Sequence, residues 1–412
     1  MKLFIITTFT LFCILASISD AWRRQSILPK GFTLSNNHFG LNIFDQLSKD
    51  NAAKSVQENI FFSPYSISMS LAMLYQGTNG TTSDELGSIL SYDLAKFKLK
   101  NDIGKEIREN LDRMKEASNN GSFVLINANS MFIDKKFSPL ESYKMVMINN
   151  FDSNLFQTDF SKPNITKDLI NKWVSEKTNQ KIQNLLESPL DPDTALALLN
   201  VVYFKGSWKL KFNNNRTERG VFTDSKNNKY ENVLFMNTKS YFNVGHLSEI
   251  EANLIELPYE GDNLSMYAIL PEDKQSDMEH IRKALNPWYI EAAIGRTYNN
   301  EVKIKFPKFK FETKYDLVPT LKNMGIKKIF KDGDFSLIGN STYLLNVNEV
   351  KHAATIDVNE EGSEASAATY ITIVKLSLNL NIPTYEFDHP FIFFIRNNKN
   401  GNILFIGEVN KF

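Results

Sequence analysis

The stretch Asp357-Val-Asn-Glu-Glu-Gly-Ser-Glu-Ala-Ser-Ala-Ala-Thr369 is followed by Tyr370-Ile-Thr-Ile-Val-Lys-Leu-Ser-Leu-Asn-Leu-Asn-Ile382. A predicted strand over 355–358 runs into acidic residues, a glycine and then very small side chains. Ala and Ser bury little apolar surface, so in an ordinary domain this run indicates an exposed loop or a linker. It contains no proline, however, and its small side chains fit either face of a β-sheet. We therefore interpret it as a loop that can also become a strand.

The alternation of side chains supports this interpretation, because successive residues of a strand point to opposite faces. Counted from Gly362, one face is uncharged and its side chains grow from small to β-branched, so it fits a dry sheet interior. The other face begins with Glu364, which would stay in water, where an unpaired charge costs little. The first face carries Ser363, Ala365, Ala367, Thr369, Ile371 and Ile373, and the second carries Glu364, Ser366, Ala368, Tyr370, Thr372 and Val374.

The composition gives no sign of a nucleic-acid or acidic-membrane partner, because 47 basic and 47 acidic side chains give a net charge of zero. A chain of 412 residues could hold two or three domains. Predicted helices and strands nevertheless follow one another without a long linker, repeat or change of composition. We expect one large α+β domain over residues 20–412.

Most elements are predicted from periodicity and from turn and cap residues. Ser63 before Pro64 predicts a helix start, and the helix should be buried because it is apolar nearly all round. Predicted helices cover 32–47, 64–76, 94–115, 168–186 and 314–324. Predicted strands cover 59–62, 123–133, 195–204, 253–257, 264–270, 301–306, 309–313, 391–396 and 402–409.

The N-terminus has the pattern of a signal peptide. Met1 and Lys2 precede an apolar run over 3–18, and small residues follow. We expect a signal over 1–19, with cleavage after Ala21 as the alternative, and a secreted, extracellular protein. A membrane anchor is disfavoured because the run is short and has the wrong flanks. The only cysteine, Cys13, lies in this segment, so the mature chain would contain no disulfide and no thiol nucleophile.

Secretion would make the Asn-x-Ser/Thr triplets glycosylation candidates. Asn120 lies in a polar run and is the best exposed of them by sequence. The candidates are Asn79, Asn120, Asn164, Asn215, Asn263 and Asn340.

Basic residues between 94 and 115 suggest a glycosaminoglycan site, but acidic residues alternate with them. A solvated amphipathic helix is the preferred interpretation.

No enzyme motif is present. The chain lacks a Gly-x-Ser-x-Gly turn, a His-Glu-x-x-His helix and a phosphate-binding loop, and none of its five histidines has a catalytic spacing. We expect no enzymatic activity, no metal and no cofactor.

Six stretches together resemble the serpins, the serine-protease-inhibitor family, from about residue 32 to 412. One of them, Asn59-Ile-Phe-Phe-Ser-Pro-Tyr-Ser-Ile-Ser68, is similar to the family's first strand and buried helix. The others are Asn171-Lys-Trp-Val174, Asn200-Val-Val-Tyr-Phe-Lys-Gly-Ser-Trp208, Glu256-Leu-Pro-Tyr259, Phe306-Pro-Lys-Phe309 and Asp388-His-Pro-Phe-Ile-Phe393.

The resemblance implies a metastable fold of three β-sheets and about nine helices, with an exposed reactive-centre loop at about 360–385. In inhibitory serpins the target protease cleaves this loop and stays bound as an acyl-enzyme, because the loop inserts into the main sheet. The resemblance therefore implies a monomer that forms a covalent 1:1 complex with a serine protease. An inhibitor of papain-like proteases and a non-inhibitory binding serpin are the alternatives.

The resemblance also assigns roles by position. The reactive bond would join Leu376 to Ser377, which favours a chymotrypsin-like target, whereas a shift of one residue to Lys375 would favour a trypsin-like one. A polar cluster under the sheet would comprise Ser63, Ser66, Asn200 and His352, with Trp208 where the sheet opens. Ala353 departs from the family, in which Lys is common. The hinge would comprise Glu360, Glu361, Gly362, Ser363, Glu364, Ala365, Ser366, Ala367, Ala368 and Thr369.

Overall fold

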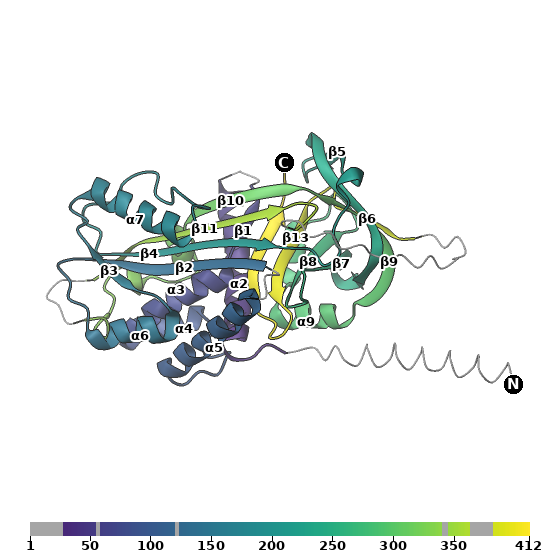
Figure 1. The fold of residues 1–412 in the computed structure, drawn as a ribbon. Helices are drawn as coiled ribbons and strands as arrows, with labels where there is room; N and C mark the ends of the chain where they lie inside the picture. Colours follow the sequence, from purple (N-terminus) through teal and green to yellow (C-terminus); the bar gives the residue numbers. More distant parts are fainter. Residues whose placement is uncertain (1–27, 55–57, 120–122, 340–344, 363–381) are drawn as a thin grey trace.

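A five-stranded sheet spans one half of the computed structural model, which describes residues 28–54, 58–119, 123–339, 345–362 and 382–412. Its order is β10-β11-β4-β2-β3 (Figure 1). The two central strands, β4 and β11, are parallel neighbours, and β10 and β2 pair antiparallel with them. The strands are β2 (Phe123–Asp134), β3 (Leu155–Thr158), β4 (Leu196–Gly206), β10 (Phe309–Asp316) and β11 (Val347–Val358).

A nine-stranded sheet forms the other half, with the order β1-β14-β13-β8-β7-β6-β9-β12 and with β5 paired to β6. The 19-residue strand β6 pairs with β5, β7 and β9, so it joins strands that would otherwise belong to two sheets. The described strands therefore form two hydrogen-bonded sheets. They are β1 (Ile60–Phe62), β5 (Glu218–Thr223), β6 (Lys229–Leu247), β7 (Ala252–Pro258), β8 (Leu264–Pro271), β9 (Tyr298–Pro307), β12 (Thr384–Glu386), β13 (Phe391–Asn397) and β14 (Ile403–Val409).

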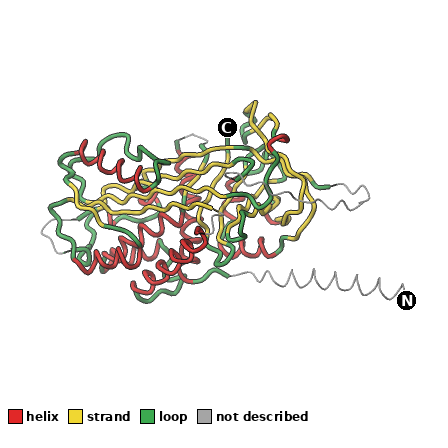
Figure 2. The backbone as a smooth tube through the Cα atoms, viewed as in Figure 1, coloured by secondary structure: helices red, strands yellow, loops and turns green. Residues whose placement is uncertain are grey.

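Nine α-helices occur in the described residues, and some of them cover the two faces of the five-stranded sheet (Figures 1 and 2). Helices α3 to α6 lie on one side and α7 lies on the other. The helices are α2 (Gly31–Ala53), α3 (Pro64–Gly77), α4 (Gly80–Ile89), α5 (Lys100–Asn119), α6 (Glu141–Phe151), α7 (Pro163–Lys177), α8 (Met278–Ala284), α9 (Pro287–Gly295) and α10 (Val318–Asn323).

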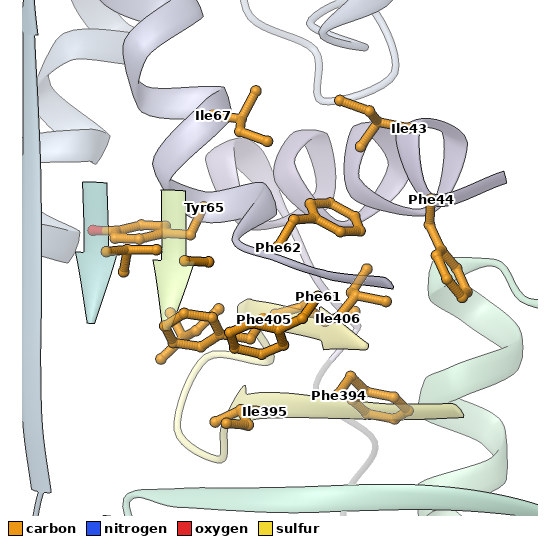
Figure 3. Packing of buried hydrophobic residues seen from close by; sticks show 14 of the residues in the cluster. Ile43, Phe44, Phe61, Phe62, Tyr65, Ile67, Phe394, Ile395, Phe405 and Ile406 are labelled. Carbon is orange, nitrogen blue, oxygen red and sulfur yellow. The ribbon is translucent and has the colours of Figure 1, made fainter. Parts of the chain in front are cut away.

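Strand β4 is apolar on both faces because each face is covered. Leu198 and Val202 belong to the main core, whereas Leu199 packs in a second cluster with Ile170 and Val174 of α7. In the main core, Phe61 stacks on Phe405 of β14 at 5.3 Å between ring centroids (Figure 3). Such burial on both sides explains the continuous apolar run of this strand.

The expected α+β fold is confirmed, but four of the five predicted helices have the wrong bounds. The predicted helix 32–47 is α2, which continues to Ala53, and the predicted helix 94–115 is α5, which begins at Lys100 and ends at Asn119. The predicted helix 168–186 is α7, which begins at Pro163 and ends at Lys177, and the apolar residues after it pack without helical structure. The predicted helix 314–324 begins only at Val318, because β10 continues through Asp316 opposite β11. No helix among the described residues is long and apolar enough to cross a membrane.

Candidate functional site

The turn Asn359–Gly362 continues β11 and lies against the chain that follows β4. Because β4 and β11 are parallel, their C-terminal ends meet at the same edge of the sheet. The backbone N–H groups of Trp208 and Phe212 donate to the carbonyl oxygens of Glu361 and Glu360, at 3.2 and 2.9 Å. These bonds hold the ends of the two strands together at the point where the predicted hinge begins.

Trp208 reinforces this contact with its side chain. Its indole Nε1 donates to the carbonyl of Asn359 at 2.9 Å, and its ring stacks on Tyr259 at 4.5 Å between centroids. Asn359 in turn accepts a hydrogen bond from the N–H of Glu361 through its side-chain oxygen. Trp208 is 2 % exposed, so it seals the end of the β4–β11 pair from solvent.

The carboxylate of Glu360 adds a second, charged anchor. It accepts hydrogen bonds from Lys308 Nζ at 2.9 Å and from Thr217 Oγ1 at 2.7 Å. Burial alone would raise the pKa of this carboxyl, but the bonds from Lys308 and Thr217 outweigh it and the pKa is lowered. Glu360 is therefore held as a paired anion at the start of the hinge.

Gly362 ends the anchored turn with a φ of +73°, a backbone conformation that favours glycine. A Cβ at this position would lie 2.2 Å from the Trp208 nitrogen and 2.4 Å from the Gly206 carbonyl oxygen. Only glycine fits this close approach of the two backbones.

A buried polar cluster lies under the middle of the five-stranded sheet. Ser63 caps α3 by accepting from the N–H of Ser66, and its hydroxyl donates to the carbonyl of Leu404 at 2.7 Å. The N–H of Ser63 donates to Nε2 of His352 on β11 at 3.1 Å. The hydroxyl of Ser66 donates to Oδ1 of Asn129 on β2 at 2.7 Å. Residues at the start of α3 and on two strands are thus joined by hydrogen bonds where the sheet would have to part.

Asn200 completes the cluster on the strand between them. It is opposite His352 on β11 and opposite Asn129 on β2, and its Nδ2 donates to the carbonyl of Lys351 at 3.4 Å. The structure therefore places Ser63, Ser66, Asn200 and His352 close to one another.

Sequence reasoning missed Asn129 of the cluster, and Lys308, Thr217 and Asn359 of the anchor. No local pattern distinguishes these residues, because each depends on a partner far away in sequence.

The burial of His352 predicts that the stability of the native state depends on pH. Burial lowers its pKa from 6.5 to about 3. Between these values the unfolded chain binds a proton that the native state does not, so native stability should fall as the pH decreases from 6.5 toward 3. The expected loss is up to about 1.4 kcal/mol per pH unit.

Urea unfolding of wild type and His352→Gln between pH 7.5 and 4.5 checks this. The glutamine does not titrate and can still accept from Ser63, so its slope should be shallower than that of wild type. His280→Gln, at an exposed position of α8, is the control and should keep the wild-type slope. Equal slopes for wild type and His352→Gln would contradict the prediction.

Of the remaining predicted positions, some are exposed, one is buried, and the others lie outside the described residues. Asn79, Asn164 and Asn215 are exposed, whereas Asn263 is 7 % exposed and would have to leave the interior to carry a glycan. The described residues contain no group of three or more His, Cys, Asp or Glu that could hold a metal ion. Outside the described residues lie the signal segment 1–19, Asn120, Asn340, Ser363, Glu364, Ala365, Ser366, Ala367, Ala368, Thr369, Lys375, Leu376 and Ser377.

Comparison with known proteins defines the class. The family model described as "Serpin (serine protease inhibitor)" matches residues 34–412, and the chain belongs to the serpin family. Members are, in general, protease inhibitors that act through a suicide loop.

Among its relatives, the chain is 34% identical to Iripin-2 of Ixodes ricinus over 92% of this chain and 93% of that protein. It is 35% identical to Intracellular coagulation inhibitor 2 of Tachypleus tridentatus, over 91% and 90% of the two chains. Among solved structures, mouse protein-Z dependent protease inhibitor is similar with a TM-score of 0.82 and 25% identity, covering 95% of this chain and 98% of that one.

Proposed function

We propose that this protein is a secreted inhibitor of serine proteases that traps its target by cleavage and insertion of the loop after Gly362. The observation that carries the proposal is the parallel pairing of β4 and β11, with the run of small residues starting directly after the anchored end of β11. Loop insertion is the established mechanism of serpins, and this chain has the parallel pair β4 and β11 followed by a segment of small residues.

The strand pairing gives the insertion a driving force. A segment that turns back after Gly362 would run antiparallel to both β4 and β11. One parallel pairing would be replaced by two antiparallel ones, and antiparallel pairing is slightly more stable per residue. Both central strands are buried, so the inserted face must be small and uncharged, as Ser363, Ala365 and Ala367 are.

The proposed reaction begins as ordinary proteolysis. The protease serine attacks the carbonyl carbon of Leu376, an ester forms, and the amine of Ser377 leaves. Insertion of the new loop end carries the esterified protease away before water hydrolyses the ester. The outcome depends on which of these two steps is faster.

The residue at the reactive bond predicts the target class. Leu376 suits a hydrophobic specificity pocket, so chymotrypsin should form an SDS-stable complex and release a peptide that begins with Ser377. Leu376→Arg should shift the ratio of association rate constants toward trypsin by about 100-fold, because a buried carboxylate in the trypsin pocket pairs with arginine. A released peptide beginning with Leu376 would instead place the bond after Lys375.

One experiment separates the wider alternatives. Purified protein is mixed with chymotrypsin, trypsin and a papain-like protease, and complexes are sought on SDS gels. A complex with the papain-like enzyme alone would favour a cysteine-protease inhibitor, and cleavage without any complex would favour a non-inhibitory serpin.

Secretion is tested separately, because two relatives are named intracellular coagulation inhibitors. When the chain is expressed in secretory cells, the protein recovered from the culture medium should begin at Asp20 or Trp22. Retention of the protein inside the cells would oppose this part of the proposal.

A further inference from the structure

The outer face of β6, β9 and β12 carries three lysines close together. Directly opposed residues of neighbouring strands share a face, and Lys239 of β6 is opposite Lys303 of β9. Lys305 follows two residues after Lys303 on the same face. We call this surface the lysine face; its members are Asn237, Lys239, Tyr241, Glu301, Lys303, Lys305, Thr384 and Glu386.

The opposition of Lys239 and Lys303 is unfavourable for folding, because like charges directly across a pair of strands repel. Two of the lysines are compensated: Lys239 is 3.6 Å from Glu301, and Lys305 is 3.6 Å from Glu386. Within the described ranges, no ion pair joins Lys303 to a carboxylate. An uncompensated cation therefore lies at the centre of an exposed face.

The position of Lys303 relates this charge to the reactive loop. Its backbone N–H donates to the carbonyl of Pro383 at 2.9 Å, and β12 begins at the next residue, Thr384, which pairs with Lys303 itself. The lysine face is thus continuous with the C-terminal end of the loop that a protease would engage. Tyr241 lies on the same face and is 58 % exposed, and tyrosine is enriched among residues that dominate protein interfaces.

We propose that the lysine face is an accessory docking surface for an acidic patch on the target protease. The inference rests on the proposed inhibitory function and names a feature of its partner. The carboxylates of Glu301 and Glu386 lie between the lysines, and these carboxylates would repel a continuous polyanion. A protein surface, in contrast, can present isolated acidic side chains at positions that match the lysines. Complementary charge at such a surface raises the association rate more than the final affinity.

The test compares chymotrypsin with chymotrypsin whose surface lysines have been succinylated, so that the active site is shared and the surface is more acidic. Association rate constants are measured for wild type, Lys303→Glu and Lys172→Glu at about 0.02 M and about 0.3 M salt. Lys172 is the matched control, since its side chain is 78% exposed on α7 and the net charge changes equally.

Lys303→Glu should slow association with succinylated chymotrypsin about five- to tenfold at low salt, and the effect should shrink at high salt. Lys172→Glu should change it less than about twofold. Stoichiometry and the cleaved bond should be unchanged. The Lys303→Glu protein should fold normally, because the substitution removes the repulsion between Lys239 and Lys303. Thermal melting curves of the variant and of wild type check this.

Equal effects of the two variants, or none, would overturn the docking surface. The proposal would also be overturned if Lys303→Glu were no longer retained on a heparin column while its association rate constants with both forms of chymotrypsin were unchanged. That result would assign the lysine face to polysaccharide binding. If wild type forms no complex with either form of chymotrypsin while trypsin or a papain-like protease is trapped, the choice of target class fails. If no protease is trapped, the inhibitory function fails.

Discussion

Replacing Ser363 by arginine is expected to convert this serpin from an inhibitor into a substrate. Ser363 follows the anchored Gly362 directly and begins the uncharged side of the alternating segment. An inserted strand would place that side in the interior beside β4, a strand that is buried along nearly its whole length. An arginine there would bring an unpaired charge into an apolar environment.

The size of the effect follows from the competition between insertion and hydrolysis. Burying an unpaired charge costs several kcal/mol, and each 1.4 kcal/mol on the insertion barrier slows that step about tenfold. The ester should then hydrolyse before the protease has been moved. Incubation with chymotrypsin should give cleaved protein and active enzyme, with almost no SDS-stable complex.

Glu364→Arg is the matched control, since it introduces the same side chain on the face that stays in water. It should still form the complex, with a stoichiometry of inhibition close to that of wild type. If Ser363→Arg formed as much complex as Glu364→Arg, insertion of the alternating segment would not be the trapping step.

The sequence predicted best those parts of the site that depend on local chemistry. The cap at Ser63 could be predicted because one residue type meets one local requirement, a side-chain acceptor for the first turn of the helix. The apolar run of β4 was also clear, because both of its faces are buried.

Features that depend on tertiary register could not be predicted from periodicity. The Lys308–Glu360 pair joins residues 52 positions apart, and the Ser66–Asn129 bond joins residues 63 apart. The predicted helix 314–324 failed for a related reason. Tyr315 and Asp316 extend β10 because β11 is present to pair with them, and Tyr315 faces His352 across that pairing.

The same dependence on distant partners makes the side chain of Glu360 sensitive to substitution. Glu360→Ala should destabilise the native state by about 2–3 kcal/mol, since hydrogen bonds to charged groups contribute about that much. The melting temperature should fall, and inhibitory activity should be lost faster on heating, because the ends of β4 and β11 are then held mainly by the backbone bonds to Trp208 and Phe212.

Lys308→Ala and the double variant decide whether the ion pair is the cause. If it is, the double variant should be scarcely less stable than Glu360→Ala, because removing either partner already breaks the pair. Glu361→Ala is the neighbouring control. The residue is half-buried but makes no ion pair with the described residues, so stability should change by less than about 0.5 kcal/mol. A Glu361→Ala protein as heat-labile as Glu360→Ala would show that loss of any acidic side chain loosens the turn. The anchor would then be the turn itself, and the Lys308 contact would be incidental.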